Sequence, residues 1–389
     1  MVARILSIAG SDSGGGAGIQ ADIKTITALG GYAMTAVTAI TVQNTKGVSA
    51  VHPVPPEIVA GQIRACIDDV GVDAIKIGML GTEAIINAVA DELAGCNLPI
   101  VLDPVMIAKG GSALIEEEAV WALMQRLVPL ASVITPNAPE LEALTETDVT
   151  DAADMLLAAQ ELLNAGPRAV LAKGGHLDGD QLTDWLVTRH GHQAFASARI
   201  DTRHTHGTGC TLAAALACGL GQGLPLADAA ARARSFVRLA MLSAPGLGHG
   251  HGPMGHQAVW NDVTAPSPVL NQFTLPAQDY VESVAFYRQL GLKLIVDSPA
   301  DGYARFEAGN GVTLSIHVGD GAAGGATVYL EAMALDAWVA RLQAAGLAFE
   351  QLPRDEDWRW REARLRDPAG NRVCLYHAGD DRRFPPWRV

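Results

Sequence analysis

The chain has 389 residues, 49% of them hydrophobic, so it is long enough for two domains and can bury a large core. Its formal charge of −14 argues against nucleic acid or an anionic membrane as a partner. The five scattered cysteines form no CxxC pair, and the apolar run after Arg4 is too short for a signal peptide, so we expect a cytoplasmic protein without disulfides.

The first 261 residues alternate short apolar runs with helical segments. The runs expected to be strands are 3–10, 36–42, 73–80, 100–106, 132–137 and 169–175, and the helices are expected at 57–70, 82–94 and 116–128. Strands that are apolar on both faces and alternate with helices predict a parallel sheet with helices on both faces. The polar clusters SDSGGG, QNTKG, LDPVM, PNAPE and KGGH follow these strands, at the carboxyl edge where functional loops gather.

A different pattern follows TAPSP (264–268), which reads as a linker. The remainder contains one pattern twice: a strand, a helix and three strands. The first copy has its elements at 269–276, 279–291, 292–299, 302–309 and 312–319, and the second at 326–332, 334–346, 347–353, 361–370 and 371–378. Two βαβββ modules predict an α+β domain, here 269–378, after a first domain at 1–263, with 379–389 as a tail.

The first strand is followed by GSDSGGGAGIQAD (Gly10–Asp22), which opens a helix and loosely matches the dinucleotide fingerprint. That fingerprint requires an acidic residue about 20 positions further on, and no acid occurs between Asp22 and Glu57. A hydride-transferring Rossmann domain is therefore disfavoured. No GxxxxGK[ST] is present, which excludes a P-loop.

A second glycine motif, HGTGCT (His206–Thr211), precedes an expected helix at 211–219. Backbone N–H groups at a helix N-terminus can bind phosphate, although a packing turn is the simpler explanation. Asp103, Glu140 and Lys173 end other strands, where carboxylates can hold Mg²⁺ and a lysine can neutralise phosphate. A helix cap or a surface ion pair would explain each of them singly, but their convergence on one sheet edge favours a phosphate site.

Together these motifs, with TAITVQNTKGV, KIGML and GLGHGHGPMGH, resemble the hydroxymethylpyrimidine/phosphomethylpyrimidine kinases of thiamine biosynthesis, in the ribokinase-like superfamily. The resemblance implies two successive MgATP-dependent phosphorylations of 4-amino-5-hydroxymethyl-2-methylpyrimidine. We also expect a homo-oligomer, namely a dimer. It implies pyrimidine contacts from Gly10, Asp22, Gln43, Met79 and Val105. It implies ATP contacts from Asp103, Asn137, Glu140, Lys173 and Thr208, with Asp103 and Glu140 at Mg²⁺ directly or through water. It further implies a catalytic anion hole formed by Gly207, Thr208, Gly209 and Cys210 with Lys173.

The two βαβββ modules resemble the vicinal oxygen chelate superfamily of glyoxalases, dioxygenases and bleomycin-resistance proteins, most clearly at DPAGNRVCLY (367–376). Metal-binding members place ligands at four strand positions, which fall here on Gln272, Ser315, Thr327 and Cys374. Only Gln272 is a usual ligand, and His317 lies two residues beyond Ser315, so we expect a metal-free binding or regulatory module. Its cup would use Trp338, Trp358 or Trp360 as an aromatic wall, unless these side chains are ordinary packing.

Two alternatives remain. The first is a pyridoxal or related vitamin kinase, and the second is a bifunctional protein whose C-terminal domain is a metal-dependent lyase, dioxygenase or resistance protein. Metal binding by His249, His251 and His256 is disfavoured because they have no acidic neighbours.

Cys210 stands where related sugar kinases carry a catalytic aspartate. A helix N-terminus can lower a thiol pKa, so Cys210 is expected to be either a thiolate base or a neutral wall of the anion hole.

Overall fold

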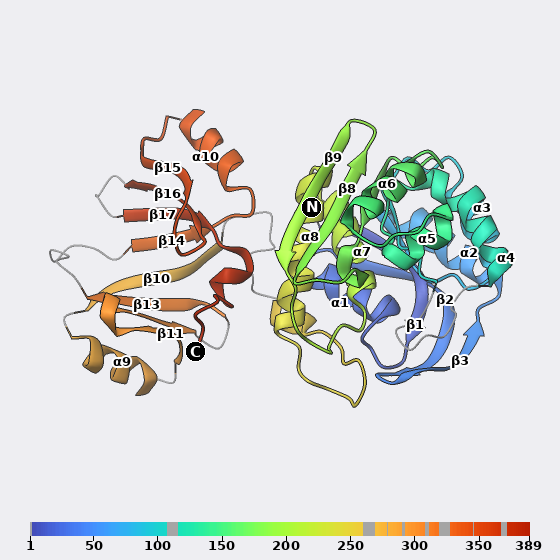
Figure 1. Ribbon diagram of the computed structural model, residues 1–389. Coiled ribbons are helices and arrows are strands. Elements are labelled where there is room, and N and C mark those ends of the chain that lie inside the picture. Colours follow the sequence, from blue (N-terminus) through green and yellow to red (C-terminus); the bar gives the residue numbers. More distant parts are fainter. Residues whose placement is uncertain are drawn as a thin grey trace. The chain divides into compact units, whose positions relative to one another are not determined.

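The computed structural model describes residues 2–106, 116–259, 269–277, 279–289, 292–307, 311–318, 327–344, 346–366 and 372–389. The chain divides into two compact units, Met1–Trp260 and Asn261–Val389 (Figure 1). The predicted linker at 264–268 and the DPAGN segment at 367–371 lie outside the described residues. No helix within the described ranges is long and apolar enough to span a membrane.

The N-terminal unit is built on a nine-stranded sheet of order β3-β2-β1-β4-β5-β6-β7-β8-β9. Strands β2, β1, β4, β5, β6 and β7 are parallel, which confirms the prediction of a mostly parallel sheet. Strands β3, β8 and β9 extend the two edges as antiparallel hairpins, which the sequence pattern did not predict. The strands are β1 (Arg4–Asp12), β2 (Tyr32–Asn44), β3 (Gly47–Pro53), β4 (Ala74–Ile77), β5 (Ile100–Leu102), β6 (Val133–Ile134), β7 (Ala169–Ala172), β8 (Gln181–Thr188) and β9 (Gly191–Ala198).

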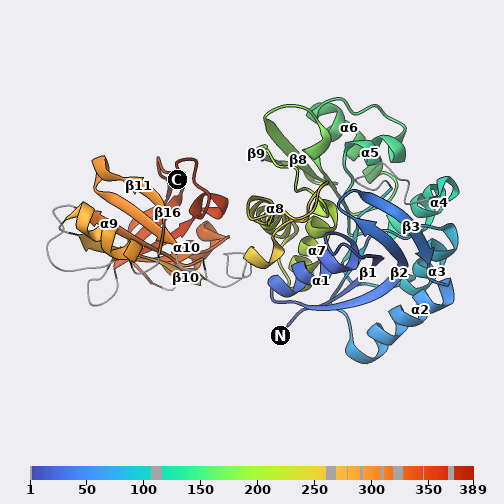
Figure 2. The ribbon, with the colours of Figure 1, turned by 90° about the horizontal axis from the view of Figure 1, so that it is seen from below.

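Helices cover both faces of this sheet (Figure 2). One face packs its apolar side chains against α2 (Pro56–Ala65), α3 (Glu83–Leu93), α4 (Glu117–Ala122), α5 (Ala138–Thr145) and α6 (Ala152–Leu163). The other face is covered by α1 (Gly18–Ala28), α7 (Thr208–Gly221) and α8 (Leu226–Leu242). Helices α2 and α4 continue as π-helical turns at Cys66–Val70 and Leu123–Leu127, so the α-helices expected to reach 70 and 128 are shorter than predicted.

Helix α7 is the central helix of the unit and is buried through most of its length, because its alanines and glycines permit close approach to the sheet. It begins at Thr208, three residues before the predicted start, so Thr208, Gly209 and Cys210 form its first turn. Gly207 precedes it with φ of 84°, and a Cβ there would lie 1.9 Å from the carbonyl oxygen of Gly16. Only glycine fits this junction between the two glycine motifs.

The C-terminal unit contains the two predicted βαβββ modules, which join in one eight-stranded sheet of order β11-β12-β13-β10-β14-β17-β16-β15. The first consists of β10 (Val269–Ala277), α9 (Tyr280–Gln289), β11 (Lys293–Ser298), β12 (Tyr303–Glu307) and β13 (Thr313–Val318). The second consists of β14 (Thr327–Glu331), α10 (Leu335–Ala344), β15 (Phe349–Asp355), β16 (Arg361–Arg366) and β17 (Arg372–His377). Helices α9 and α10 cover one face with apolar contacts, and the opposite face, here called the cup, carries polar side chains.

Candidate active site

Three predicted phosphate-site residues meet at the carboxyl edge of the N-terminal sheet. The Lys173 Nζ donates to Asp103 Oδ1 at 2.9 Å and lies 3.7 Å from Glu140 Oε2. Thr135 Oγ1 donates to the same Asp103 oxygen at 2.9 Å. Burial alone would raise the pKa of Asp103, but the ammonium groups of Lys173 and Lys76 outweigh it and hold that pKa below its usual value.

Asn137 and Glu140 have a structural role as well as the predicted one. Asn137 Oδ1 accepts the backbone N–H of Glu140, and Glu140 Oε2 accepts the backbone N–H of Asn137, which forms a capping box at the start of α5. The helix-cap explanation is therefore correct for this pair, yet the cap also holds the Glu140 carboxylate beside Lys173. Burial raises the pKa of Glu140 to about 7, against the attraction of Lys173.

The turn Gly207–Cys210 presents backbone donors toward the same cluster. In the part of the chain that the structure describes, no backbone carbonyl accepts the N–H of Gly209 or Cys210, as is usual in a first helical turn. A Cβ at Gly209 would lie 3.3 Å from both Asp103 Oδ2 and Lys173 Nζ. The absence of a side chain at Gly209 therefore lets the helix terminus approach the charged cluster closely, which brings backbone donors, a lysine and two carboxylates together.

A second charged pair lies beneath this turn. Asp22 Oδ2 accepts from Lys76 Nζ at 2.8 Å and from Ser7 Oγ at 2.6 Å, and all three side chains are fully buried. Asp22 Oδ1 is also buried but has no hydrogen-bond partner among the described residues. Burial raises the pKa of Asp22, and Lys76 opposes this effect. The pair thus holds one carboxylate oxygen in place and leaves the other buried without a hydrogen-bond partner among the described residues.

Cys210 lies close enough to Lys76, Asp22 and Asp103 for their charges to shift the pKa of its thiol. Burial raises the pKa of its thiol to about 11, and although Lys76 and the Gly18 N–H act to lower it, Asp22 and Asp103 act in the same direction as burial. Desolvation and the two carboxylates outweigh the helix terminus, which favours the neutral wall of the anion hole over the thiolate base. Cys210 is a neutral thiol at pH 7.

The loop after β1 is tied to the HGTGCT motif by Asp12 and His206. Asp12 Oδ2 accepts the N–H groups of Gly16 and Ala17 and lies 2.9 Å from His206 Nε2. Burial acts to raise the pKa of Asp12, but His206 and the backbone donors lower it overall. The two glycine motifs, almost 200 residues apart in sequence, are thus held together by one carboxylate.

The remaining predicted pyrimidine contacts surround this junction. The Gln43 side-chain nitrogen lies 3.3 Å from His206 Nε2, and Gln43 Oε1 accepts from Thr41 Oγ1. A Cβ at Gly10 would lie 3.1 Å from Met79 Sδ, so these two residues are neighbours. Val105 follows Asp103 on the same edge, and its N–H donates to the Asp103 carbonyl.

His256 is packed against helix α7. It is buried, and its Nε2 lies 2.8 Å from Thr211 Oγ1 in α7. Burial lowers the pKa of His256 to about 4, and the charge of Lys24 adds to the effect. The structure offers no group of three or more His, Cys, Asp or Glu side chains suited to a metal ion in the ranges that it describes.

The depressed pKa of His256 predicts a stability change in mild acid. Between its usual pKa near 6.5 and about 4 the unfolded chain binds a proton that the folded chain does not, so stability falls as pH decreases through this window. We expect the wild type to lose about 2 kcal/mol more than His256→Gln between pH 8 and pH 5. Urea denaturation of both proteins measures this, with the exposed His249→Gln as the control, and equal losses in all three would contradict it.

Several residues of the site were not assigned a role from the sequence: Ser7, Asp12, Lys76, Thr135 and His206. Burial of Lys76 could have been predicted, because it is a single lysine inside the apolar run DAIKIGML and a buried ammonium group needs a partner. Its partner Asp22 lies 54 positions earlier, and no periodic pattern identifies which acid it pairs with.

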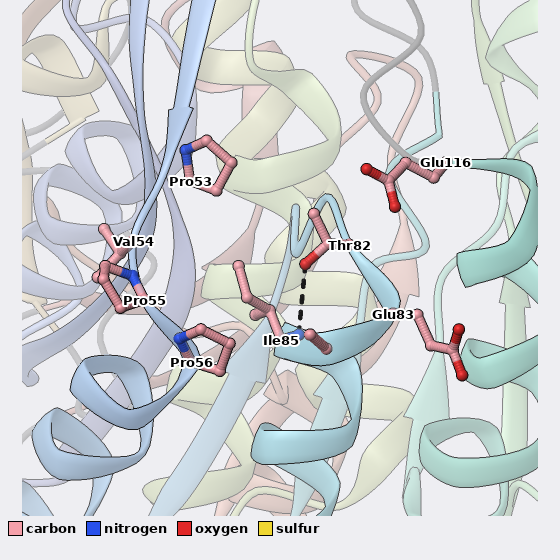
Figure 3. Close-up of a pocket in the computed structure, with 9 residues that line it drawn as sticks. Pro53, Val54, Pro55, Pro56, Thr82, Glu83, Ile85 and Glu116 are labelled. Atoms are coloured by element: carbon pink, nitrogen blue, oxygen red, sulfur yellow. Dashed lines mark hydrogen bonds between the residues drawn. The ribbon is translucent and has the colours of Figure 1, made fainter.

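A cavity of about 500 Å³ lies elsewhere on the N-terminal unit. Its lining residues are Pro53–Pro56, Thr82–Ile85 and Glu116 (Figure 3), none of which is a predicted site residue. Thr82 caps α3 by accepting the N–H of Ile85, and the only charged groups are the Glu83 and Glu116 carboxylates. This lining offers no lysine, arginine or histidine side chain to bind a phosphate group, so we place the functional site at the Asp103 and Asp22 clusters.

In the C-terminal unit, the four positions that correspond to metal ligands share the cup face. Gln272 lies opposite Tyr329 on β14, which lies opposite Cys374 on β17, so a tyrosine separates two of the four. Gln272 donates to Ser315 Oγ at 3.3 Å. Burial raises the pKa of Cys374, and Glu362 adds to the effect, so its sulfur is a neutral thiol.

The three candidate tryptophans have different surroundings. Trp338 is partly buried and packs against the apolar cluster between α10 and the sheet. Trp358 is 40% exposed and donates its indole N–H to Glu362. Trp360 is buried in the cup, where it stacks on Tyr376 with ring centroids 4.5 Å apart. Trp360 therefore lies where a wall of the cup was predicted, and Trp338 does not.

Comparison with known proteins agrees with this division. The family described as phosphomethylpyrimidine kinase matches residues 12–255, and the glyoxalase/bleomycin resistance protein/dioxygenase superfamily matches residues 269–375. The thiamine biosynthesis bifunctional protein ThiED of Geobacter sulfurreducens is 48% identical over 67% of this chain, which spans only 53% of that relative. The hydroxymethylpyrimidine/phosphomethylpyrimidine kinase of Rhizobium meliloti is 47% identical over 67% of this chain and 99% of its own length.

Two solved structures resemble the N-terminal unit. Phosphomethylpyrimidine kinase from Clostridium difficile has a TM-score of 0.55 and 41% identity, covering 61% of this chain and 98% of its own. The pyridoxal kinase of Bacillus subtilis, solved as an ADP complex, has a TM-score of 0.62 and 36% identity, covering 66% and 98%. Because the family match extends over more than half of the sequence, the chain belongs to the phosphomethylpyrimidine kinase family and carries a glyoxalase-like domain after its kinase domain.

Proposed function

We propose that the N-terminal unit phosphorylates 4-amino-5-hydroxymethyl-2-methylpyrimidine with ATP and then phosphorylates the resulting monophosphate, as the names of its relatives indicate for those proteins. In the first step the substrate hydroxyl oxygen bonds to the γ-phosphorus of ATP, the bond to ADP breaks, and the hydroxyl proton is lost. In the second step a phosphate oxygen of the monophosphate is the nucleophile.

The observation that carries this proposal is that two groups of side chains with different chemistry, one around Lys173 and one around Asp22, lie on either side of the Gly207–Cys210 turn. Lys173, Asp103 and the free N–H groups of the turn provide charge and donors for a phosphoryl group. Asp22 provides a buried carboxylate oxygen without a partner, which can accept the N–H of an aminopyrimidine. One side of the turn suits a phosphate and the other suits a polar aromatic ring.

The same residues fit ATP with Mg²⁺. Asp103 and Glu140 supply the carboxylate oxygens that Mg²⁺ prefers, and both face the space beside Gly209 and Lys173. The metal would neutralise phosphate charge when bound. Lys173 would orient the transferred phosphoryl group, while the backbone N–H groups of Gly209 and Cys210 would hold its oxygens.

A coupled assay of ADP release tests the substrate. We expect the aminopyrimidine alcohol to be used with kcat/KM at least about tenfold above that of pyridoxal, because its amine would supply a donor for the unpartnered Asp22 Oδ1. The likeness to pyridoxal kinase makes pyridoxal the necessary comparison. Asp22→Asn should reduce the difference in kcat/KM between the two alcohols. A higher kcat/KM of the wild type for pyridoxal would overturn the proposal.

For the C-terminal unit we propose a metal-free binding or regulatory role. The positions corresponding to metal ligands carry Ser315, Thr327 and a neutral Cys374 besides Gln272, and Gln272 is already bonded to Ser315 and Thr313. A catalytic divalent site needs about three protein ligands with open positions, and this set does not provide them.

A further inference from the structure

The C-terminal segment Gly379–Val389 does not extend from the protein as a tail but folds back over the cup of its own unit (red, marked C in Figure 1). It begins with a short 3-10 helix, Gly379–Arg382, directly after β17. At its far end the N–H of Val389 lies 3.4 Å from the Ile295 carbonyl oxygen on β11. The segment thus runs from the second module to the outer strand of the first.

Arg382 is the centre of this contact. Its side chain is 1% exposed, and its Nε lies 3.1 Å from Glu331 Oε2, whose side chain is fully buried. The guanidinium also donates to the carbonyl oxygen of Gly311 at 3.0 Å. The other oxygen of Glu331 accepts the backbone N–H groups of Ala378 and Gly379. A carboxylate at the floor of the cup therefore holds both the side chain and the start of the segment.

The cup also binds the backbone at Arg382. Arg305 Nη1 donates to the Arg382 carbonyl oxygen at 3.1 Å. The Arg305 guanidinium lies 4.5 Å from the ring centroid of Trp360, which in turn stacks on Tyr376. This stack of one cation and two aromatic rings fixes Arg305 in the orientation that contacts the segment.

A second carboxylate receives two more arginines of the segment. Glu307 Oε1 accepts from Arg383 Nε at 2.9 Å, and Glu307 Oε2 lies 3.8 Å from Arg388 Nη2. Both Glu307 and Arg383 are largely buried. Three arginines of this eleven-residue segment thus lie against two carboxylates of the cup, Glu331 from the second module and Glu307 from the first.

We propose that the cup of the C-terminal unit is a guanidinium-binding site for an arginine-bearing peptide, and that the chain's own segment 379–389 is its resident ligand. The chemistry that selects this ligand is a buried carboxylate for the Arg382 guanidinium, a stacked arginine for its carbonyl oxygen, and a second carboxylate for Arg383. Any other ligand of the cup must displace this segment. The inference is independent of the kinase reaction.

The test uses a chain that ends at Ala378 and a synthetic peptide of residues 379–389. We expect the peptide to bind the shortened chain in calorimetry and to raise its melting temperature, whereas a peptide with Arg382→Met should bind at least about tenfold more weakly. A peptide with Trp387→Ala is the matched control, since Trp387 is 41% exposed. Absence of binding to the folded shortened chain, or equal binding of the Arg382→Met peptide, would overturn the proposal.

If the shortened chain does not fold, the full chain provides the measurement. Glu331→Gln, Arg382→Met and the double variant form a cycle in which the melting temperatures should be strongly non-additive, with the double variant no less stable than either single one. Additive losses would refute the pairing. Stabilisation that grows with protein concentration would show that the segment comes from a second copy, which would overturn its assignment to the same chain.

Discussion

Replacement of Lys173 by methionine is expected to reduce kcat of both phosphorylation steps by about 10³-fold. Lys173 is the cation that lies within reach of both Asp103 and Glu140 at the Gly207–Cys210 turn. Burial opposes its charge, but the two carboxylates raise its pKa, so it remains an ammonium group at any working pH. Steady-state kinetics with each acceptor measures the loss, and KM should change much less than kcat.

The fold of this variant must be checked, because methionine leaves Asp103 and Glu140 without their cation. Breaking a buried ion pair costs about 3–5 kcal/mol, which could by itself reduce activity. The double variant Lys173→Met/Asp103→Asn removes the unpaired charge and should regain stability without regaining activity. Lys293→Met, at an exposed position of β11 in the other unit, controls for loss of a positive charge. If Lys173→Met keeps more than a tenth of the activity, Lys173 is not the phosphoryl-orienting group.

The charged groups of the site show what could be predicted from the sequence and what could not. Asp103 and Lys173 end strands of a parallel sheet, and such ends converge whatever the register, so their meeting followed from the alternation of strands and helices. The pairing of Asp22 with Lys76 depends instead on the packing of α1 against the sheet. Periodicity identifies the buried face of a helix but does not identify which neighbour lies opposite each side chain.

The edge hairpins were missed for a related reason. Strands β8 and β9 alternate polar and apolar residues because one face is exposed, whereas the prediction rested on continuous apolar runs. The C-terminal sequence DDRRFPPWRV is polar and contains two prolines, so the sequence alone shows nothing that distinguishes it from the predicted tail. Its burial depends on Glu331 and Glu307, and a pairing between charged residues so far apart has no periodic signature.

The raised pKa of Cys210 bears directly on how one site serves two acceptors of different charge. A thiol with a pKa of about 11 is almost wholly protonated at pH 7, so a thiolate base would be present in only about one molecule in 10⁴. If the thiolate were the base, the rate of the first step would rise about tenfold per pH unit up to that pKa. We infer that Cys210 acts as a neutral wall of the anion hole.

Cys210→Asp is accordingly expected to lower kcat/KM of the second phosphorylation by about 100-fold or more, and that of the first by less than about tenfold. The monophosphate acceptor is largely a dianion at pH 7, and a carboxylate in the first turn of α7 would repel it by about 3 kcal/mol at an effective dielectric near 20. The uncharged alcohol of the first step escapes this repulsion. The new carboxylate would also lie close to Asp22 and Asp103, so the comparison between the two acceptors within one protein is the informative quantity.

Cys210→Ser is the matched control, because it keeps a small neutral donor at the same position. It should leave the ratio of the two steps close to that of the wild type and should not change the pH profile of the first step between pH 7 and pH 9. A selective loss of the first step in Cys210→Ser would restore the base role, and an unaffected second step in Cys210→Asp would refute the electrostatic argument. A neutral thiol is compatible with both acceptors because it imposes no charge on either, whereas the aspartate of related sugar kinases would suit the alcohol alone.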